Sequence, residues 1–87
     1  LEEARQAFVA SAPNYRNQPG LVRKQYLLSE DGKTAGGIYC WTSRQDAEAL
    51  FTDSWKELVR GKYGADPSLA YFDNPVTVDN LTDEISA

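Results

Sequence analysis

The sequence contains no histidine and no methionine, and it has one cysteine among its 87 residues. Histidine is the commonest general base and metal ligand, so its absence excludes a Ser-His-Asp triad, the usual zinc hydrolases and a histidine-ligated haem. The lone Cys40 excludes an intrachain disulfide and a paired-cysteine redox or zinc motif, as is usual in the reducing cytoplasm. We therefore expect a cytoplasmic protein without a metal site or other cofactor, with Cys40 buried.

Long hydrophobic runs are also missing. Nowhere do 18 apolar residues follow one another, so the sequence predicts no membrane-spanning helix and no membrane partner. With 41% hydrophobic and 25% charged residues, the composition is that of a folded globular protein. A chain of 87 residues makes one domain with a thin core, which often needs a partner subunit to cover its apolar surface.

Clusters of basic residues are missing as well, and the only adjacent basic pair is Arg23-Lys24. Residues 1–65 hold nine basic and eight acidic side chains, whereas residues 66–87 hold five acidic and no basic ones. Phosphate binding needs grouped Lys and Arg, so we expect no nucleic-acid partner. We expect a single domain over residues 1–78, followed by an acidic C-terminal tail over residues 79–87.

A first helix is predicted at the start of the chain, where Leu1, Ala4, Phe8 and Ala12 recur at helical spacing before Pro13 ends the pattern. The chain begins almost on this helix, so we expect further residues upstream of it. A polar connector over residues 14–20 follows and ends in a Pro-Gly turn signal.

Two strands are predicted over residues 21–28 and 35–41, and the Asp31-Gly32 pair between them indicates an antiparallel hairpin. The adjacent Gly36 and Gly37 indicate a bulge or a close backbone approach at the start of the second strand. Strict alternation places Val22, Lys24, Tyr26 and Leu28 on one face of the first strand. In the second strand it separates Tyr39 and Trp41 from Ile38 and Cys40.

A second helix is predicted from a Ser43 cap to Gly61 or Gly64. Its apolar stripe consists of Ala47, Leu50, Phe51, Ser54 and Leu58, with Trp55 on the flank. A short strand is predicted over residues 68–72. One strand before the first helix would complete βαββαβ, the split βαβ plan of an α+β ferredoxin-like domain, and that strand is absent from this sequence.

The motifs that carry a family resemblance are Pro19-Gly20-Leu21, Lys24, Tyr26, Ala35-Gly36-Gly37-Ile38-Tyr39, Ser43 with Ala47-Glu48-Ala49, and Phe72-Asp73. Over about residues 2–78 they resemble the YdhR-like mono-oxygenases of the dimeric α+β barrel superfamily, which includes antibiotic-biosynthesis monooxygenases. The resemblance implies a homodimer whose sheets pack face to face, with a small-molecule pocket between sheet and helices. It also implies oxygenation without metal or flavin.

Such oxygenation needs an electron-rich, phenol- or enol-like substrate and an apolar pocket with a few hydrogen bonds to hold its anion. We take Tyr39 and Trp41 as the candidate catalytic residues. The candidate substrate-binding residues are Lys24, Tyr26, Phe51, Trp55 and Tyr71.

Each assignment has a structural alternative. Aromatic residues at strand periodicity usually belong to a core or an interface, and a lysine on an apolar face can lie at an edge or pair with a carboxylate. The polar connector, including Tyr15, is expected to be solvated. A non-catalytic small-molecule-binding or structural dimer is the alternative function, because fold alone does not fix function. The sequence leaves open which sheet face lines the pocket.

Overall fold

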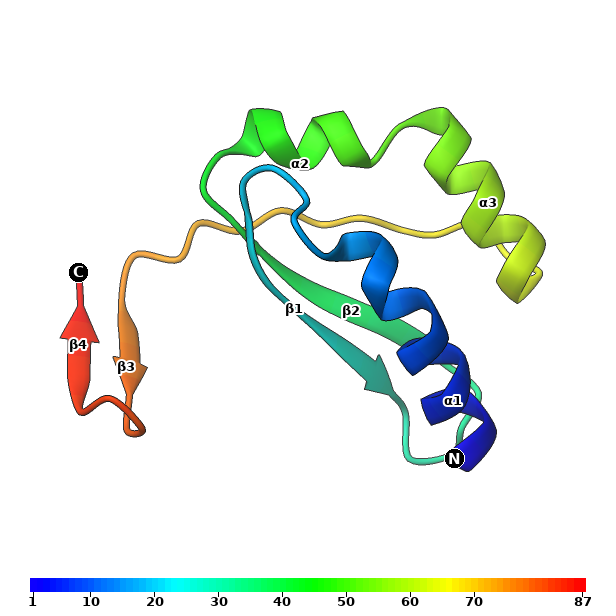
Figure 1. Cartoon of the computed structure of the whole chain (residues 1–87), viewed down its shortest axis with the longest axis horizontal. Helices are drawn as coiled ribbons and strands as arrows, with labels where there is room; N and C mark the ends of the chain where they lie inside the picture. Colours follow the sequence, from blue (N-terminus) through cyan, green and yellow to red (C-terminus); the bar gives the residue numbers. More distant parts are fainter.

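The computed structural model describes all residues from 1 to 87 and shows an α+β chain with two small antiparallel sheets. Its elements in order are α1 (Glu2–Ser11), the 3-10 helix η1 (Ala12–Tyr15), β1 (Leu21–Leu28), β2 (Ala35–Trp41), α2 (Arg44–Leu50), α3 (Asp53–Tyr63), β3 (Thr77–Asp79) and β4 (Glu84–Ser86). In Figure 1, α1 runs beside the β1–β2 ribbon, and the β3–β4 hairpin stands apart from the rest. The order from α1 to α3 is part of the ferredoxin-like plan.

The first helix turns only part of the expected stripe inward. Leu1 is 94% exposed and Ala12 already belongs to η1, where Pro13 sits in the first turn. Ala4 and Phe8 are half-buried as expected, and Ser11 is buried. Positions 4, 8 and 11 continue one face of an α-helix, so the small hydroxyl of Ser11 takes the inward position.

The hairpin between β1 and β2 is confirmed. Gly32 has φ +74°, and the carboxylate of Asp31 accepts hydrogen bonds from the Ser29 hydroxyl at 2.6 Å and the Lys33 amide at 2.9 Å. These two bonds lower the pKa of Asp31. Asp supplies the acceptor and Gly the left-handed backbone, which is why this dipeptide closes the hairpin.

The strand register contains one irregularity that alternation did not predict. Leu21 pairs with Trp41 but Arg23 pairs with Cys40, so Val22 is an extra residue, a β-bulge. The bulge places Leu21 on the helix side with Lys24, Tyr26 and Leu28, whereas Val22 is 64% exposed. Our assignment of Val22 to that face was wrong.

The Gly36-Gly37 pair serves a close approach and not a bulge, because pairing through it is regular. A Cβ on Gly37 would lie 3.3 Å from the Tyr39 ring and 3.5 Å from Cε of Lys24. The missing side chain therefore leaves room on the inner face for Tyr39 and Lys24.

The second predicted helix is two helices. Ser43 caps α2 by accepting from the Asp46 amide at 3.2 Å, as expected. Phe51 then leaves the helical conformation, and Thr52 caps α3 by accepting from the Trp55 amide at 3.2 Å. The N-cap at Thr52 lies within the apolar stripe and starts a new helix there, although the spacing of apolar residues continues across it. The helix pair ends at Gly64, which has a left-handed φ of +77°.

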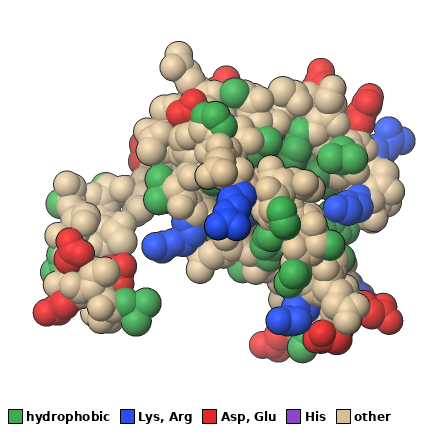
Figure 2. All heavy atoms as spheres, in the orientation of Figure 1, with side chains coloured by type: hydrophobic (Ala, Val, Ile, Leu, Met, Phe, Trp, Pro, Cys, Tyr) green, Lys and Arg blue, Asp and Glu red, His purple; other side chains and the backbone are tan.

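Residues after Gly64 differ most from expectation. The predicted strand at 68–72 is wrong, because residues 65–76 contain no strand or helix. Pro67 and Pro75 bracket this segment and cannot donate to a ladder. The acidic tail, in turn, includes most of a hairpin, in which Val78 pairs with Ile85. In Figure 2 acidic side chains gather on this hairpin, while the basic side chains lie on the body of the molecule.

The three helices lie on one side of the β1–β2 sheet, as contacts of Phe8 with Tyr26 and of Phe51 with Tyr39 show. The opposite side is bare: Val22, Leu27 and Ile38 are 64%, 46% and 54% exposed. Cys40 also lies on this bare face and is exposed, so the expectation of a buried thiol was wrong. None of the helices is long and apolar enough to cross a membrane.

The core is thin. Only Ala47 and Ser11 are buried, with 1% and 8% exposure. Most of the packing between sheet and helices comes from half-buried aromatic rings.

Candidate functional site

Aromatic side chains from β2, α2 and α3 form one packed wall on the inner face of the sheet. The rings of Tyr39 and Trp41 lie 6.1 Å apart and nearly parallel. Phe51 meets both edge-on, with centroids 5.0 Å from Tyr39 and 5.7 Å from Trp41. Trp55 packs on Phe51 at 4.7 Å. The break between α2 and α3 makes this possible, because it turns Phe51 and Trp55 toward the same strand.

Lys24 projects from β1 into a group of three tyrosines, which we call the tyrosine cage. Its ammonium nitrogen lies 3.3 Å from the ring centroid of Tyr15, 4.0 Å from that of Tyr26 and 4.8 Å from that of Tyr39. Register explains the geometry, since Lys24 pairs directly with Tyr39 across the hairpin. Ring faces attract cations, so the cage holds the ammonium group in place.

The lysine has no carboxylate partner. The ion pairs of the chain are Arg5–Glu2, Arg44–Glu48 and Arg60–Asp66, all at exposed positions. Burial of Lys24 lowers its pKa, although the neighbouring Tyr15 opposes this shift. The amine is therefore easier to deprotonate than a surface lysine.

Tyr15 is the residue that sequence reasoning missed, because it was assigned to the solvated connector. Trp55 donates its indole N–H to the hydroxyl of Tyr15 at 3.2 Å. Burial alone would raise the pKa of Tyr15, but this hydrogen bond and the charge of Lys24 together lower it. The missed signal is the spacing of Phe8, Ser11 and Tyr15, which continues the inner helical face through η1.

The side chain of Tyr26 is held in place by contacts with α1. Its ring stacks on Phe8 with centroids 4.9 Å apart, and its hydroxyl lies 2.7 Å from that of Ser11. Ser11 donates to the Phe8 carbonyl at 3.1 Å, so Tyr26 must be the donor to Ser11. Burial raises the pKa of Tyr26.

Tyr39 and Trp41, the two candidate catalytic residues, are half-buried in the wall. Burial raises the pKa of Tyr39 far above its usual value, so this phenol stays protonated. The indole N–H of Trp41 is buried and has no hydrogen-bond partner. An unpaired buried donor is uncommon in folded proteins.

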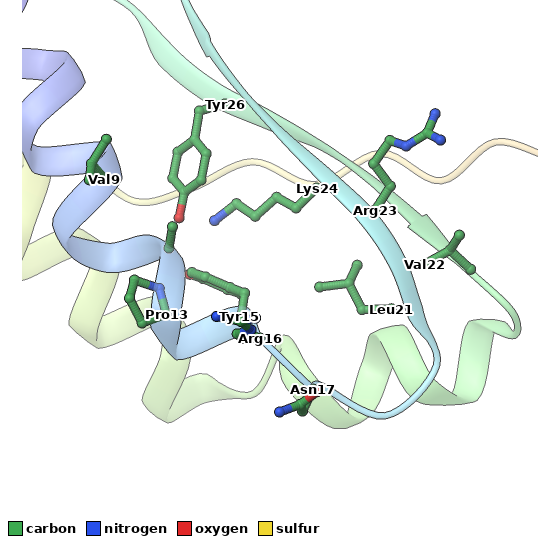
Figure 3. A pocket seen from close by; sticks show the side chains of 11 residues that line it. Val9, Pro13, Tyr15, Arg16, Asn17, Leu21, Val22, Arg23, Lys24 and Tyr26 are labelled. Atoms are coloured by element: carbon green, nitrogen blue, oxygen red, sulfur yellow. The ribbon is translucent and has the colours of Figure 1, made fainter. Parts of the chain in front are cut away.

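An open groove of about 460 Å³ lies in front of the cage, between the end of α1, η1 and β1. Figure 3 shows Lys24 extending from the strand toward Tyr15 and Tyr26. Lys24 and both tyrosines line the groove, and Leu21 closes its side next to Trp41. No three cysteine or carboxylate side chains come together in a group that could hold a metal ion.

The structure thus brings together six of the seven candidate residues: Lys24, Tyr26, Tyr39, Trp41, Phe51 and Trp55. It leaves Tyr71 apart, in the segment after α3, where the guanidinium of Arg44 lies 4.1 Å from its ring. The inner face carrying Tyr39 and Trp41 turns toward the helices, but of these six residues only Lys24 and Tyr26 line the groove.

Comparison with known proteins gives one match. The family model described as "Putative mono-oxygenase ydhR" matches residues 1–64, from the first helix to the Gly64 cap. The match contains the whole cage and wall but stops short of the resemblance noted to residue 78, so Tyr71 and Phe72-Asp73 lie outside it. No curated protein and no solved structure matches the chain.

Proposed function

Because the chain belongs to the ydhR mono-oxygenase family, we propose that it oxygenates a small phenol- or enol-like molecule without a cofactor, at the tyrosine cage. The single observation that carries this assignment is the placement of Lys24. A half-buried amine without a carboxylate partner stands among phenols at the end of a groove. The group that such an amine can pair with is an anion that enters the groove.

The amine can act first as a base and then as a counter-ion. In its neutral form Lys24 accepts the proton of the substrate hydroxyl, and the resulting ammonium group stabilises the phenolate or enolate. The lowered pKa of Lys24 increases the fraction of neutral amine near neutral pH. Tyr15 lies in contact with Lys24 and can donate a hydrogen bond to the same anionic oxygen.

In the oxygenation step the substrate anion itself supplies the electron. The anion passes one electron to dioxygen, and the radical pair combines to form a carbon–oxygen bond at a carbon that carries hydrogen. The resulting peroxide anion takes up the proton that Lys24 removed from the substrate and becomes a hydroperoxide. Loss of water from the hydroperoxide leaves a carbonyl group. One dioxygen is consumed, one of its atoms remains in the product and the other leaves as water. The aromatic wall of Tyr39, Trp41 and Phe51 does not line the groove, so it would exclude water only on the side of the cage where Tyr39 lies.

We also propose that the functional unit is a homodimer. The outer face of the β1–β2 sheet exposes Val22, Leu27 and Ile38, and no helix of the chain covers it. Sheets with apolar residues on both faces are normally covered on both. A second copy packed on this face would bury Leu27 and Ile38, and also Val22, which lines one edge of the groove.

Oxygen uptake tests the proposal. The chain, treated with a chelator, is mixed with a panel of phenols and enols in an oxygen electrode, and labelled dioxygen is followed into the product. We expect one dioxygen consumed per product and a large loss of rate in Lys24→Gln. The matched control is Lys33→Gln, since Lys33 lies exposed in the hairpin turn.

Binding without oxygen uptake would favour the alternative, a non-catalytic small-molecule-binding protein. Oxygen uptake that Lys24→Gln leaves unchanged would show that the cage is not the reaction site. A thermal-shift screen with the same compounds separates these outcomes, because a ligand that binds only the folded state raises the melting temperature.

A further inference from the structure

The groove in front of the cage carries positive charge only. Among its lining residues are Arg16, Arg23 and Lys24, three of the nine basic side chains of the chain, and no Asp or Glu. The chain as a whole has thirteen acidic residues and a net charge of −4. A groove with this charge, in a protein of the opposite sign, selects anions.

None of these three bases is neutralised by the protein. All three ion pairs of the chain involve other basic residues. Lys24 lies at the inner end of the groove, whereas Arg16 follows η1 directly and is exposed. Figure 3 shows Arg23 extending from β1 in the direction opposite to Lys24, away from Tyr15 and Tyr26. Two separate positive positions therefore remain for a ligand, one deep and one at the opening.

The hydroxyl groups show which polar contacts the deep position offers. Tyr26 donates its proton to Ser11, and Ser11 donates to the Phe8 carbonyl, so neither proton points to a ligand. Tyr15 accepts from Trp55 and keeps its own proton for donation. The deep position thus presents a lysine amine and one phenol proton, which suits a single ionisable oxygen.

The walls between the two positions are apolar. Val9 and Pro13 line the groove from the α1 and η1 side, and Leu21 lines it from β1. Such walls suit a ring or a short hydrocarbon body, and Asn17 adds one polar amide to the lining.

We propose that the substrate is a hydroxyaryl carboxylic acid, with its phenol at Lys24 and Tyr15 and its carboxylate at Arg16. A guanidinium group binds a carboxylate through two parallel hydrogen bonds, which a neutral amide group cannot reproduce. The inference rests on the proposed function for its premise that the groove is the substrate site. It adds the class of the substrate and a residue, Arg16, that selects it.

The test compares 4-hydroxyphenylacetate with 4-hydroxyphenylacetamide, which differ in charge but hardly in shape. Binding to the full-length chain is measured by calorimetry or by tryptophan fluorescence, at low and high salt. We expect the acid to bind roughly tenfold more tightly than the amide, because a hydrogen bond to a charged group is lost in the amide. High salt should reduce this preference.

Substitutions then show which basic residue binds the carboxylate of the acid. Arg16→Gln should abolish the preference for the acid while leaving amide binding unchanged, and Lys24→Gln should weaken both ligands. The matched control is Arg5→Gln, since Arg5 lies on α1 in an exposed pair with Glu2 and does not line the groove. Equal binding of acid and amide, or a preference lost in Arg23→Gln and kept in Arg16→Gln, would overturn the assignment.

Measurements of binding and of turnover distinguish a failure of the substrate class from a failure of the proposed function. If the acid binds with the expected preference and no oxygen is consumed, the hydroxyaryl acid stands as the class of ligand and the mono-oxygenase proposal fails. If neutral phenols are oxygenated and the acid has no advantage in binding or in kcat/KM, the mono-oxygenase proposal stands and the hydroxyaryl acid is wrong.

Discussion

The indole N–H of Trp55 donates to the phenol of Tyr15 at 3.2 Å, joining residues forty positions apart in the sequence. This bond ties α3 to η1 and also orients the ring that covers the Lys24 ammonium group. One contact therefore contributes both to the packing of the helices and to the geometry of the candidate site.

Replacing Tyr15 with Phe should lower the free energy of unfolding by about 1 kcal/mol, because the Trp55 donor loses its acceptor in a partly buried setting. Urea denaturation followed by tryptophan fluorescence measures the change. Tyr63→Phe is the control, since Tyr63 is 49% exposed. If Tyr15→Phe and Tyr63→Phe are equally stable, the hydrogen bond contributes nothing to folding.

Replacing Lys24 with Met should raise the melting temperature at pH 7, because burial disfavours the ammonium form in the folded state. The pKa of Lys24 is lowered on folding, so the unfolded chain holds this proton to higher pH than the folded chain does. The stability contributed by Lys24 therefore rises with pH between its lowered pKa and its unfolded pKa of about 10.4. The advantage of Lys24→Met should shrink across that window. Melting curves of both proteins from pH 7 to 10 would contradict the lowered pKa if their difference stayed constant.

Tyr39→Phe and Trp41→Phe should leave melting nearly unchanged and weaken ligand binding or turnover. The Trp41 N–H has no partner to lose, and Phe keeps most of the ring contacts in the wall. Denaturation and oxygen uptake are measured on the same preparations. A purely structural role predicts the reverse, with function kept and roughly 1 kcal/mol of stability lost.

Placing a charge on the bare sheet face should separate the proposed dimer. Ile38→Glu puts a carboxylate among the exposed side chains of that face, and light scattering should then report a monomer of 9.7 kDa. Leu58→Glu is the control, because Leu58 is similarly exposed, at 67%, but lies on α3. A wild-type chain that is already monomeric at micromolar concentration would remove the dimer proposal.

Removing metal should not change the protein. We expect the purified chain to be colourless and its oxygen uptake to survive dialysis against a chelator. Elemental analysis and an absorption spectrum check this. Iron, copper or flavin bound in stoichiometric amount would show that the chemistry proposed at Lys24 is wrong.

Local signals predicted the parts of the fold that local interactions decide. The Asp31-Gly32 turn fixed the hairpin, and the hairpin register in turn placed Lys24 opposite Tyr39. The Ser43 cap was also read correctly, because its acceptor and donor lie three residues apart.

Features that depend on distant contacts were missed. The bulge at Val22 lies where the chain enters β1 beside Gly20, whose φ is +76° and where a Cβ would overlap the Asp46 carboxylate. That contact joins the connector to α2, and nothing in the alternation of residues 21–28 reveals it. Tyr15 was missed for the same reason, since its partner Trp55 lies in another helix.

The predicted strand over residues 68–72 does not form, because a β-strand is stabilised by hydrogen bonds to a neighbouring strand. Residues 65–76 remain unpaired, and the Arg44 guanidinium contacts Tyr71 there instead. Two prolines flank the segment and remove amide donors at its ends.

The thin core has a physiological consequence. Only Ala47 and Ser11 are buried, so aromatic rings hold helices to sheet, and two of these rings, Tyr15 and Tyr26, also line the groove. A molecule seated in the groove would supply apolar contacts that the chain lacks, so ligand and fold would stabilise each other. We expect the unliganded chain to be degraded faster by proteases in the cell, so that its abundance follows the supply of its ligand.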